Sequence, residues 1–187
     1  MNRFASLCIA LCAVMLLAAC AAKPELIARS GGNPEQVDLS GNWRLQGGAE
    51  RAPTVEPQMR VPTGTSASQR SRRSGSSNGT SLGVFIEHGN LLKVSQTDYG
   101  IFFSFDRAIV HEYNFGENTD VAVGPIEARR VSGWDGQSFV TDTMDEAGNL
   151  LTESWRLEDG GEILVRDISI SRKNKQSFFM RQRFEQR

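Results

Sequence analysis

The chain has 187 residues, of which 39% are hydrophobic, a composition ordinary for one soluble domain with short appendages. Lys and Arg number 21 against 22 Asp and Glu, so the formal net charge of -1 gives no sign of a nucleic-acid-binding protein. The cysteines are Cys8, Cys12 and Cys20, and the histidines are His88 and His111. This distribution excludes a Cys/His metal cluster in the body of the chain, and we expect no cofactor.

The amino-terminal residues have the pattern of a signal segment. Arg3 is the only charge before Lys23, and the residues between Phe4 and Ala22 are almost all apolar or small. A positive start, an apolar stretch of this length and small residues at its end are typical of secreted proteins.

The end of the apolar stretch, Leu17-Ala18-Ala19-Cys20, resembles the lipobox of bacterial lipoproteins. The resemblance implies that a signal peptide of residues 1–19 is cut between Ala19 and Cys20, and that acyl chains such as palmitate are attached at Cys20. At about 0.8 kcal/mol per buried methylene, several acyl chains hold a protein stably on a membrane. In the same family an Asp after the cysteine favours the inner membrane. Ala21 stands there, so we expect an anchor in the outer membrane that faces the periplasm.

Two other interpretations of this stretch stay open. Residues 4–22 are about long enough for an uncleaved helical anchor, because a bilayer crossing needs roughly 20 apolar residues. An ordinary signal peptide cut at the alanines would leave Cys20 as a free thiol. Removal of the signal leaves Cys20 as the only cysteine, so we expect a mature chain without disulfides that is stabilised by core packing.

Residues 20–37 are expected to form a polar, lipidated tether. They contain Gly31-Gly32-Asn33-Pro34 and show no apolar periodicity. Fully stretched, the seventeen residues from 21 to 37 reach about 55 Å. A single domain over 38–187 follows. We expect its first strand over 38–45, where Leu39, Trp43 and Leu45 share one face.

Residues 47–80 are expected to be a flexible Ser/Gly/Arg-rich insertion. The run from 64 to 80 has too little apolar surface to offset the entropy of ordering it. Positive charge collects in this segment, because Arg51, Arg60, Arg70, Arg72 and Arg73 stand against a single acidic residue between 51 and 80. Such a basic segment can bind an anionic envelope polymer, but five arginines spread over thirty residues without aromatic residues between them favour an insertion that is only solvated.

From residue 82 onward, short β-rich runs alternate with turn residues. Strands are predicted over 82–88, 90–98, 100–106, 108–115, 120–131, 137–144, 150–157, 162–170 and 176–185. The connections are too short for crossover helices, so the sheet is antiparallel. The fold class is therefore all-β: a meander of about ten strands that forms a barrel or a strongly bent sheet. We expect the last strand, with Phe178, Met180 and Phe184 on one face, to close the sheet near Trp43.

Near its start, the first predicted strand contains Gly41-Asn42-Trp43, which resembles the Gly-x-Trp signature of lipocalin-type barrels. This resemblance implies a lipocalin-like domain with a pocket for a small amphiphile. The insertion over 47–80 is longer than the lid that follows the first lipocalin strand, which puts the pocket in doubt. The whole plan, a lipobox followed by such a domain, also resembles β-rich lipoproteins of Gram-negative bacteria, a likeness that implies no chemistry.

No catalytic arrangement stands out, so no catalytic residue is assigned and the chain is expected not to be an enzyme. His88 and His111 each have a neighbouring glutamate, but adjacent strand residues point to opposite faces. Arg129 and Arg130 likewise point to opposite faces, and an inward guanidinium can bind an anionic ligand. The alternative, which we favour, is an outward arginine with an acidic partner on the neighbouring strand. Trp43, Arg129 and Trp134 are the candidate ligand-binding residues, with core packing as the alternative role of the tryptophans.

These observations predict a membrane-anchored, non-enzymatic envelope lipoprotein that binds a small amphiphile. A second hypothesis is an interaction or assembly module with a filled barrel, which docks to an envelope polymer or protein through its basic loop. A third is an enzyme whose acidic residues come from distant strands. An apolar cavity of roughly 300 to 1,000 Å³ would favour the first hypothesis, and a packed interior the second.

Overall fold

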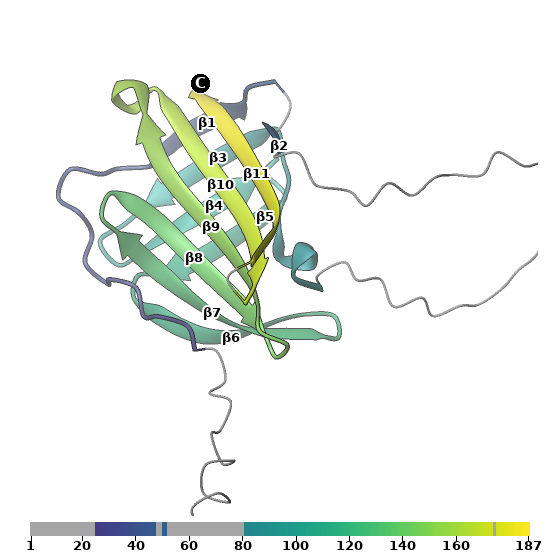
Figure 1. Cartoon of the computed structure of the whole chain (residues 1–187). Coiled ribbons are helices and arrows are strands. Elements are labelled where there is room, and N and C mark those ends of the chain that lie inside the picture. Colours follow the sequence, from purple (N-terminus) through teal and green to yellow (C-terminus); the bar gives the residue numbers. More distant parts are fainter. Residues whose placement is uncertain (1–24, 48–49, 52–80, 174) are drawn as a thin grey trace, which may run out of the picture.

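The computed structural model describes residues 25–47, 50–51, 81–173 and 175–187, which form one antiparallel sheet curled into a barrel (Figure 1). The strands are β1 Gly41–Leu45, β2 Glu50–Arg51, β3 Leu91–Gln96, β4 Gly100–Phe105, β5 Ile109–Asn114, β6 Glu117–Val123, β7 Ile126–Asp135, β8 Ser138–Asp145, β9 Asn149–Glu158, β10 Ile163–Arg172 and β11 Lys175–Gln186. Two 3-10 helices, η1 Ser81–Phe85 and η2 Asp159–Gly161, accompany them. The predicted all-β class is confirmed.

The order of the strands in the sheet follows the chain, as a meander requires. It runs β5-β4-β3-β1-β11-β10-β9-β8-β7-β6, and the short β2 pairs with β11 beside this path. β11 closes the sheet against β1, where Trp43 stands opposite Gln186. The predicted closure by the last strand is confirmed, and it leaves neither β1 nor β11 as an edge.

The remaining edges, β5 and β6, do not pair with each other over residues 109–123. At one end of this gap β7 contacts β5, where the Ser132 hydroxyl of β7 donates to the Asn114 carbonyl of β5 at 2.7 Å. The Gly116 amide donates to the Ser132 carbonyl at 2.8 Å in the same place. The backbone pairing of the barrel is therefore interrupted between β5 and β6, and these contacts lie at the turn that connects the two strands.

One half of the interior is an aromatic core. Phe103 stacks on Trp155 with ring centroids 4.4 Å apart. The ring centroids of Phe103 and Phe139 are 5.9 Å apart. The other buried members of this cluster are Leu39, Trp43, Leu92, Val94, Ile101, Phe105, Trp134, Leu164 and Phe184. They alternate with outward residues along their strands, as predicted.

The other half of the interior is closed by η1, where the sequence predicted a strand over 82–88. Leu82 and Phe85 stand three residues apart, which is the repeat of a 3-10 turn, and both are buried. They pack with Leu151 and Ile168 from the barrel wall. A strand would have turned the two side chains to opposite faces, so this strand prediction is wrong.

The single strand predicted over 120–131 is also wrong, because two strands occupy this region. β6 ends at Val123 and β7 begins at Ile126, with Gly124 and Pro125 as the turn. Gly124 has a φ of 58°, a conformation that favours glycine. Pro125 lies outside the sheet ladder, where its missing amide hydrogen costs nothing. The proline therefore marks a hairpin turn between two strands.

Several predictions concern residues outside the described part of the chain. The signal segment 1–19, the cleavage site at Ala19 and Cys20, and most of the insertion 47–80 belong to this group. Within the insertion the structure describes β2, which pairs with Met180 and Arg181 of β11. In the described residues, no helix is both long enough and apolar enough to span a membrane.

Residues 25–37 were assigned to the tether, but the structure places them along the barrel wall (Figure 1). We call residues 25–31 the strap. Ser30 exchanges two backbone hydrogen bonds with Trp134 of β7, at 3.0 and 3.3 Å. Gly133 permits this approach, because a Cβ at that position would lie 2.5 Å from the Ser30 carbonyl oxygen. The folded domain therefore begins before the predicted boundary at residue 38.

Charged side chains fix the strap as well. The Arg29 guanidinium donates to Asp142 at 2.5 Å and to Asp135 at 2.8 Å. Burial of Arg29 would lower its pKa, but the hydrogen bonds and charges of these two carboxylates outweigh burial and raise it. Further along, the Gln96 side chain donates to Asn33 and to the Val37 carbonyl at 2.9 and 2.7 Å. These bonds join residues far apart in the sequence, which is why the polar composition alone suggested a tether.

Candidate functional site

A buried polar layer separates the two halves of the barrel interior. On β10, Leu164 belongs to the aromatic core and Ile168 to the η1 cluster, and Arg166 lies between them. Arg166 is 1% exposed and forms a buried ion pair with Glu153. Its guanidinium also donates to the Gln182 side chain at 3.0 Å. The described residues therefore fill the middle of the interior with paired groups.

Two aromatic rings and one backbone carbonyl complete the surroundings of Arg166. The guanidinium carbon lies 4.8 Å from the Trp155 ring centroid and 5.3 Å from that of Phe105. A third bond, of 2.7 Å, goes to the carbonyl of Glu87, which follows η1 in the chain. Arg166 thus holds the segment after η1 in place, a structural role that the sequence did not reveal.

The inward arginine of the Arg129 and Arg130 pair is Arg130. Its Nε donates to the Thr143 hydroxyl at 2.9 Å, and its guanidinium lies 5.4 Å from the Tyr113 ring centroid. Burial, and after it the charge of Glu153, raise the pKa of Tyr113 to about 12. Arg130 therefore contacts groups of the barrel interior through one hydrogen bond and aromatic rings.

The two histidines lie apart from each other and have different surroundings. His88 is exposed in the coil after η1, and His111 lies in β5. Nε2 of His111 is 3.3 Å from a Glu87 carboxylate oxygen, without the geometry of a hydrogen bond. Among the described residues, no group of three or more His, Cys, Asp or Glu is placed to hold a metal ion.

The candidate ligand-binding residues separate into core and surface. Trp43 and Trp134 are 2% and 3% exposed and belong to the aromatic core. Trp43 donates its indole hydrogen to the Leu39 carbonyl at 3.2 Å, and Trp134 packs edge-on against Phe139. Their places in the core agree with the packing alternative. Only Arg129 reaches a surface that a ligand can approach.

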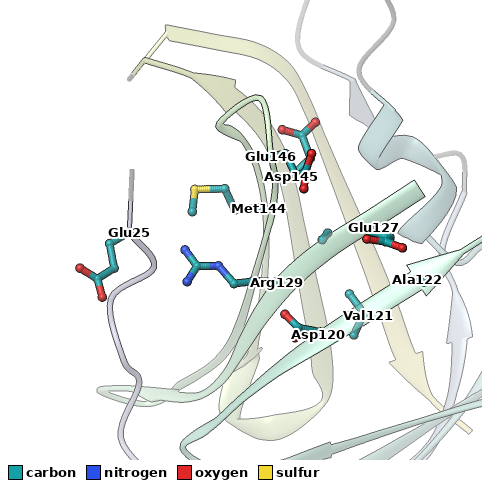
Figure 2. Close-up of a pocket in the computed structure, with 10 residues that line it drawn as sticks. Glu25, Asp120, Val121, Ala122, Glu127, Arg129, Met144, Asp145 and Glu146 are labelled. Carbon is teal, nitrogen blue, oxygen red and sulfur yellow. The ribbon is translucent and has the colours of Figure 1, made fainter. Parts of the chain in front are cut away.

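Arg129 lines a groove on the outer side of β6, β7 and β8. The groove has a volume of about 750 Å³. Figure 2 shows the Arg129 and Met144 side chains extending toward Glu25 of the strap, with Asp120 on the neighbouring strand. The lining residues are Glu25, Asp120, Val121, Ala122, Glu127, Ala128, Arg129, Met144, Asp145 and Glu146. Three strands and the strap therefore build one concave surface.

The groove combines apolar side chains with charges of both signs. Four lining residues are apolar and five are carboxylates, and none of the ten is aromatic. The register places Asp120 directly opposite Arg129, and Arg129 opposite Met144. Arg129 forms no salt bridge with any described residue. The groove thus offers an unpaired guanidinium beside carboxylates and a thioether.

Sequence reasoning found one groove residue, Arg129, through strand alternation. It missed the others because they come from three strands and from a segment assigned to the tether. One signal was present: Asp120, Glu127 and Arg129 all point outward from neighbouring strands once Gly124-Pro125 is read as a hairpin. The contribution of Glu25 depends on the docked strap, which has no local signature.

No protein-family model matches the sequence, and no curated protein matches it. Among solved structures, the chain is similar to REP1-NXSQ fatty acid transporter, with a TM-score of 0.46 and 13% identity over 80% of this chain and 96% of that one. Zebrafish ileal bile acid-binding protein complexed with cholic acid gives a TM-score of 0.43 and 10% identity over 79% and 98%. A secretory abundant heat-soluble protein from Ramazzottius varieornatus gives 0.42 and 8% over 57% and 77%.

Proposed function

We propose that this chain is a lipid-anchored, non-enzymatic binding protein of the bacterial envelope, and that its β domain takes a small amphiphile into the groove of β6, β7 and β8. The observation that carries the binding proposal is the groove itself. Its volume of about 750 Å³ lies within the range of roughly 300 to 1,000 Å³ that is typical of small-molecule sites.

The composition of the groove supports an amphiphilic ligand. Met144 and Ala122 supply apolar contact on the outer face, and the carboxylates and Arg129 supply fixed charge. A ligand with one apolar and one charged part can use both, whereas a purely polar ligand leaves the apolar part unused. Because side chains pack the middle of the barrel interior, we place the ligand on this outer surface.

The sequence around Cys20 supports the anchoring part of the proposal. The lipobox resemblance of Leu17-Ala18-Ala19-Cys20 implies acylation there, and two or three chains give stable attachment. We place the protein in the outer membrane, facing the periplasm. Metabolic labelling with a fatty-acid analogue tests the anchor: the native chain takes up the label, and Cys20→Ala abolishes both label and membrane fractionation. Labelling that persists in Cys20→Ala would refute the anchor.

The groove is tested with dodecylamine and the chain from residue 21 onward, which contains every described strand and the strap. We expect saturable binding with amide NMR shifts that centre on β6, β7 and β8. Ala122→Trp fills the groove and should abolish the binding. Ser169→Trp, an outward position on β10, is the matched control and should leave it unchanged. Shifts confined to the barrel interior would contradict a groove site.

The filled interior also favours a second candidate, an interaction module that docks to an anionic envelope polymer through the basic segment of residues 47–80. Cosedimentation of the same soluble chain with peptidoglycan tests it. Glutamine at Arg51, Arg60, Arg70, Arg72 and Arg73 should abolish cosedimentation if this module is correct. Cosedimentation that persists in this variant, or that the native chain lacks, contradicts the second candidate.

A further inference from the structure

The docked strap brings the groove close to the lipid anchor. Arg29 and Ser30 are fixed on β7 and β8, and Glu25 lies at the groove. Four residues lie between Cys20 and Glu25, and the five residue steps from Cys20 to Glu25 span at most about 18 Å. The tether expected from sequence reached about 55 Å. With Cys20 acylated, the groove is therefore held within reach of the lipid head groups.

The charges in the groove are arranged for a ligand that carries both signs. Arg129 lies between Asp120 on β6 and Met144 on β8, and Glu127 lies two residues before it on the same outward face. Guanidinium groups bind phosphate oxygens through paired hydrogen bonds, and carboxylates accept hydrogen bonds from ammonium groups. An anion alone would meet repulsion from the carboxylates, and a cation alone would leave Arg129 unpaired. A zwitterion satisfies both kinds of side chain.

The lining residues also distinguish between kinds of ammonium group. A trimethylammonium group has no hydrogen to donate and is held by the faces of aromatic rings. None of the ten lining residues is aromatic, whereas five are carboxylates. A primary ammonium has three hydrogens to donate and suits such acceptors. The lining therefore favours a primary amine.

We propose that the groove binds the phosphoethanolamine head group of a phospholipid from the membrane that holds the anchor. Arg129 takes the phosphate, Glu127 and Asp120 take the ammonium, and Met144 contacts the start of the acyl chains. This inference rests on the proposed function, because it assumes both the lipid at Cys20 and an amphiphile in the groove. It adds the chemical class of the ligand's head group and the source of the ligand, which is the membrane that holds the anchor.

Short-chain phospholipids test the head group with the soluble chain from residue 21 onward. Dihexanoyl phosphatidylethanolamine should bind about tenfold more tightly than the choline and glycerol analogues. Free phosphoethanolamine should bind at least about tenfold more weakly than the lipid, because it lacks the apolar part. Equal binding of the three lipids overturns the head-group assignment. Equal binding of lipid and free phosphoethanolamine overturns the membrane source.

Two variants separate the phosphate contact from the amine contact. Arg129→Gln should weaken phosphatidylethanolamine about tenfold and leave dodecylamine, which has no phosphate, within about twofold. Glu127→Gln should weaken both ligands. Arg44→Gln, an exposed arginine on β1, is the matched control and should change neither. If the native chain does not bind dodecylamine, the proposed function itself is refuted. If it binds dodecylamine but shows no preference among the three phospholipid head groups, only this inference is refuted.

Discussion

Two outer faces of the same barrel carry similar charged residues but differ in how these residues are paired. On the face of β9, β10 and β11, Asp167 accepts hydrogen bonds from Arg156 at 2.7 Å and from Arg181 at 2.6 Å. Glu158 binds Arg183 at 2.5 Å on the same face. On the face of β6, β7 and β8, Arg129 has no salt-bridge partner among the described residues, although carboxylates surround it.

The strand register alone does not explain this difference, because it sets Asp120 opposite Arg129 just as it sets Asp167 opposite Arg181. What differs is how the side chains cover the sheet. On β10, Val165 stands opposite Arg156 of β9 and Arg183 of β11. The paired side chains cover it, so that Val165 is 0% exposed although it faces outward. On the groove face the strap and three strands leave a concavity where such a cover would lie. Charge density alone therefore does not mark a binding site, and unpaired charge beside a concavity is the better indicator.

We call the face of β9, β10 and β11 the paired face. The largest expected effect comes from removing β11, which supplies Arg181 and Arg183 to this face. Deletion of residues 177–187 removes Met180 and Phe184, both buried, and opens β1 and β10 as edges. The loss should exceed the roughly 5 to 15 kcal/mol that stabilises a domain, so the chain should aggregate or fail to fold. Size-exclusion chromatography and thermal unfolding check this. A monomer that still unfolds cooperatively would contradict the closed barrel.

A smaller loss of stability is expected when the contact between the strap and β8 is removed. Asp142→Ala removes the acceptor of Arg29 and of the Thr152 hydroxyl, and should cost about 2 to 3 kcal/mol. Hydrogen exchange should become faster at the amides of Ser30 and Trp134, which bond each other's carbonyls. Asp120→Ala, an exposed carboxylate outside the strap contacts, serves as control. Unchanged exchange in Asp142→Ala would show that the backbone pairing alone holds the strap.

The contribution of the paired face to stability should depend on pH. Burial would raise the pKa of Asp167, but the hydrogen bonds and charges of Arg181 and Arg156 lower it below its usual value of 3.8. The Asp167 carboxylate therefore adds stability above about pH 4 that is lost as the pH falls through its lowered pKa. Asp167→Asn should cost about 1 to 2 kcal/mol at neutral pH and reduce the acid dependence of unfolding. An equal acid dependence in both proteins would contradict this.

The sequence predicted the core side of β11 better than the groove face. Alternation placed Met180 and Phe184 on one face, and both are buried, at 2% and 0% exposure, because a strand period of two depends on local order alone. The strap was missed because its key bond joins Arg29 to Asp142, 113 residues apart. The helix η1 was missed because Leu82 and Phe85 also fit a short apolar strand. Such features depend on contacts that a local pattern does not contain.

The smallest expected change in stability belongs to Arg129→Gln. Because Arg129 is exposed and has no salt bridge with the described residues, its replacement should change the free energy of unfolding by less than about 0.5 kcal/mol. Arg156→Gln on the paired face removes donors to Asp167 and Glu158 and should cost more, about 1 kcal/mol. Urea unfolding of the two variants compares the faces directly. If Arg129→Gln proved as costly as Arg156→Gln, Arg129 would have a structural partner, and its assignment to ligand binding would lose its basis.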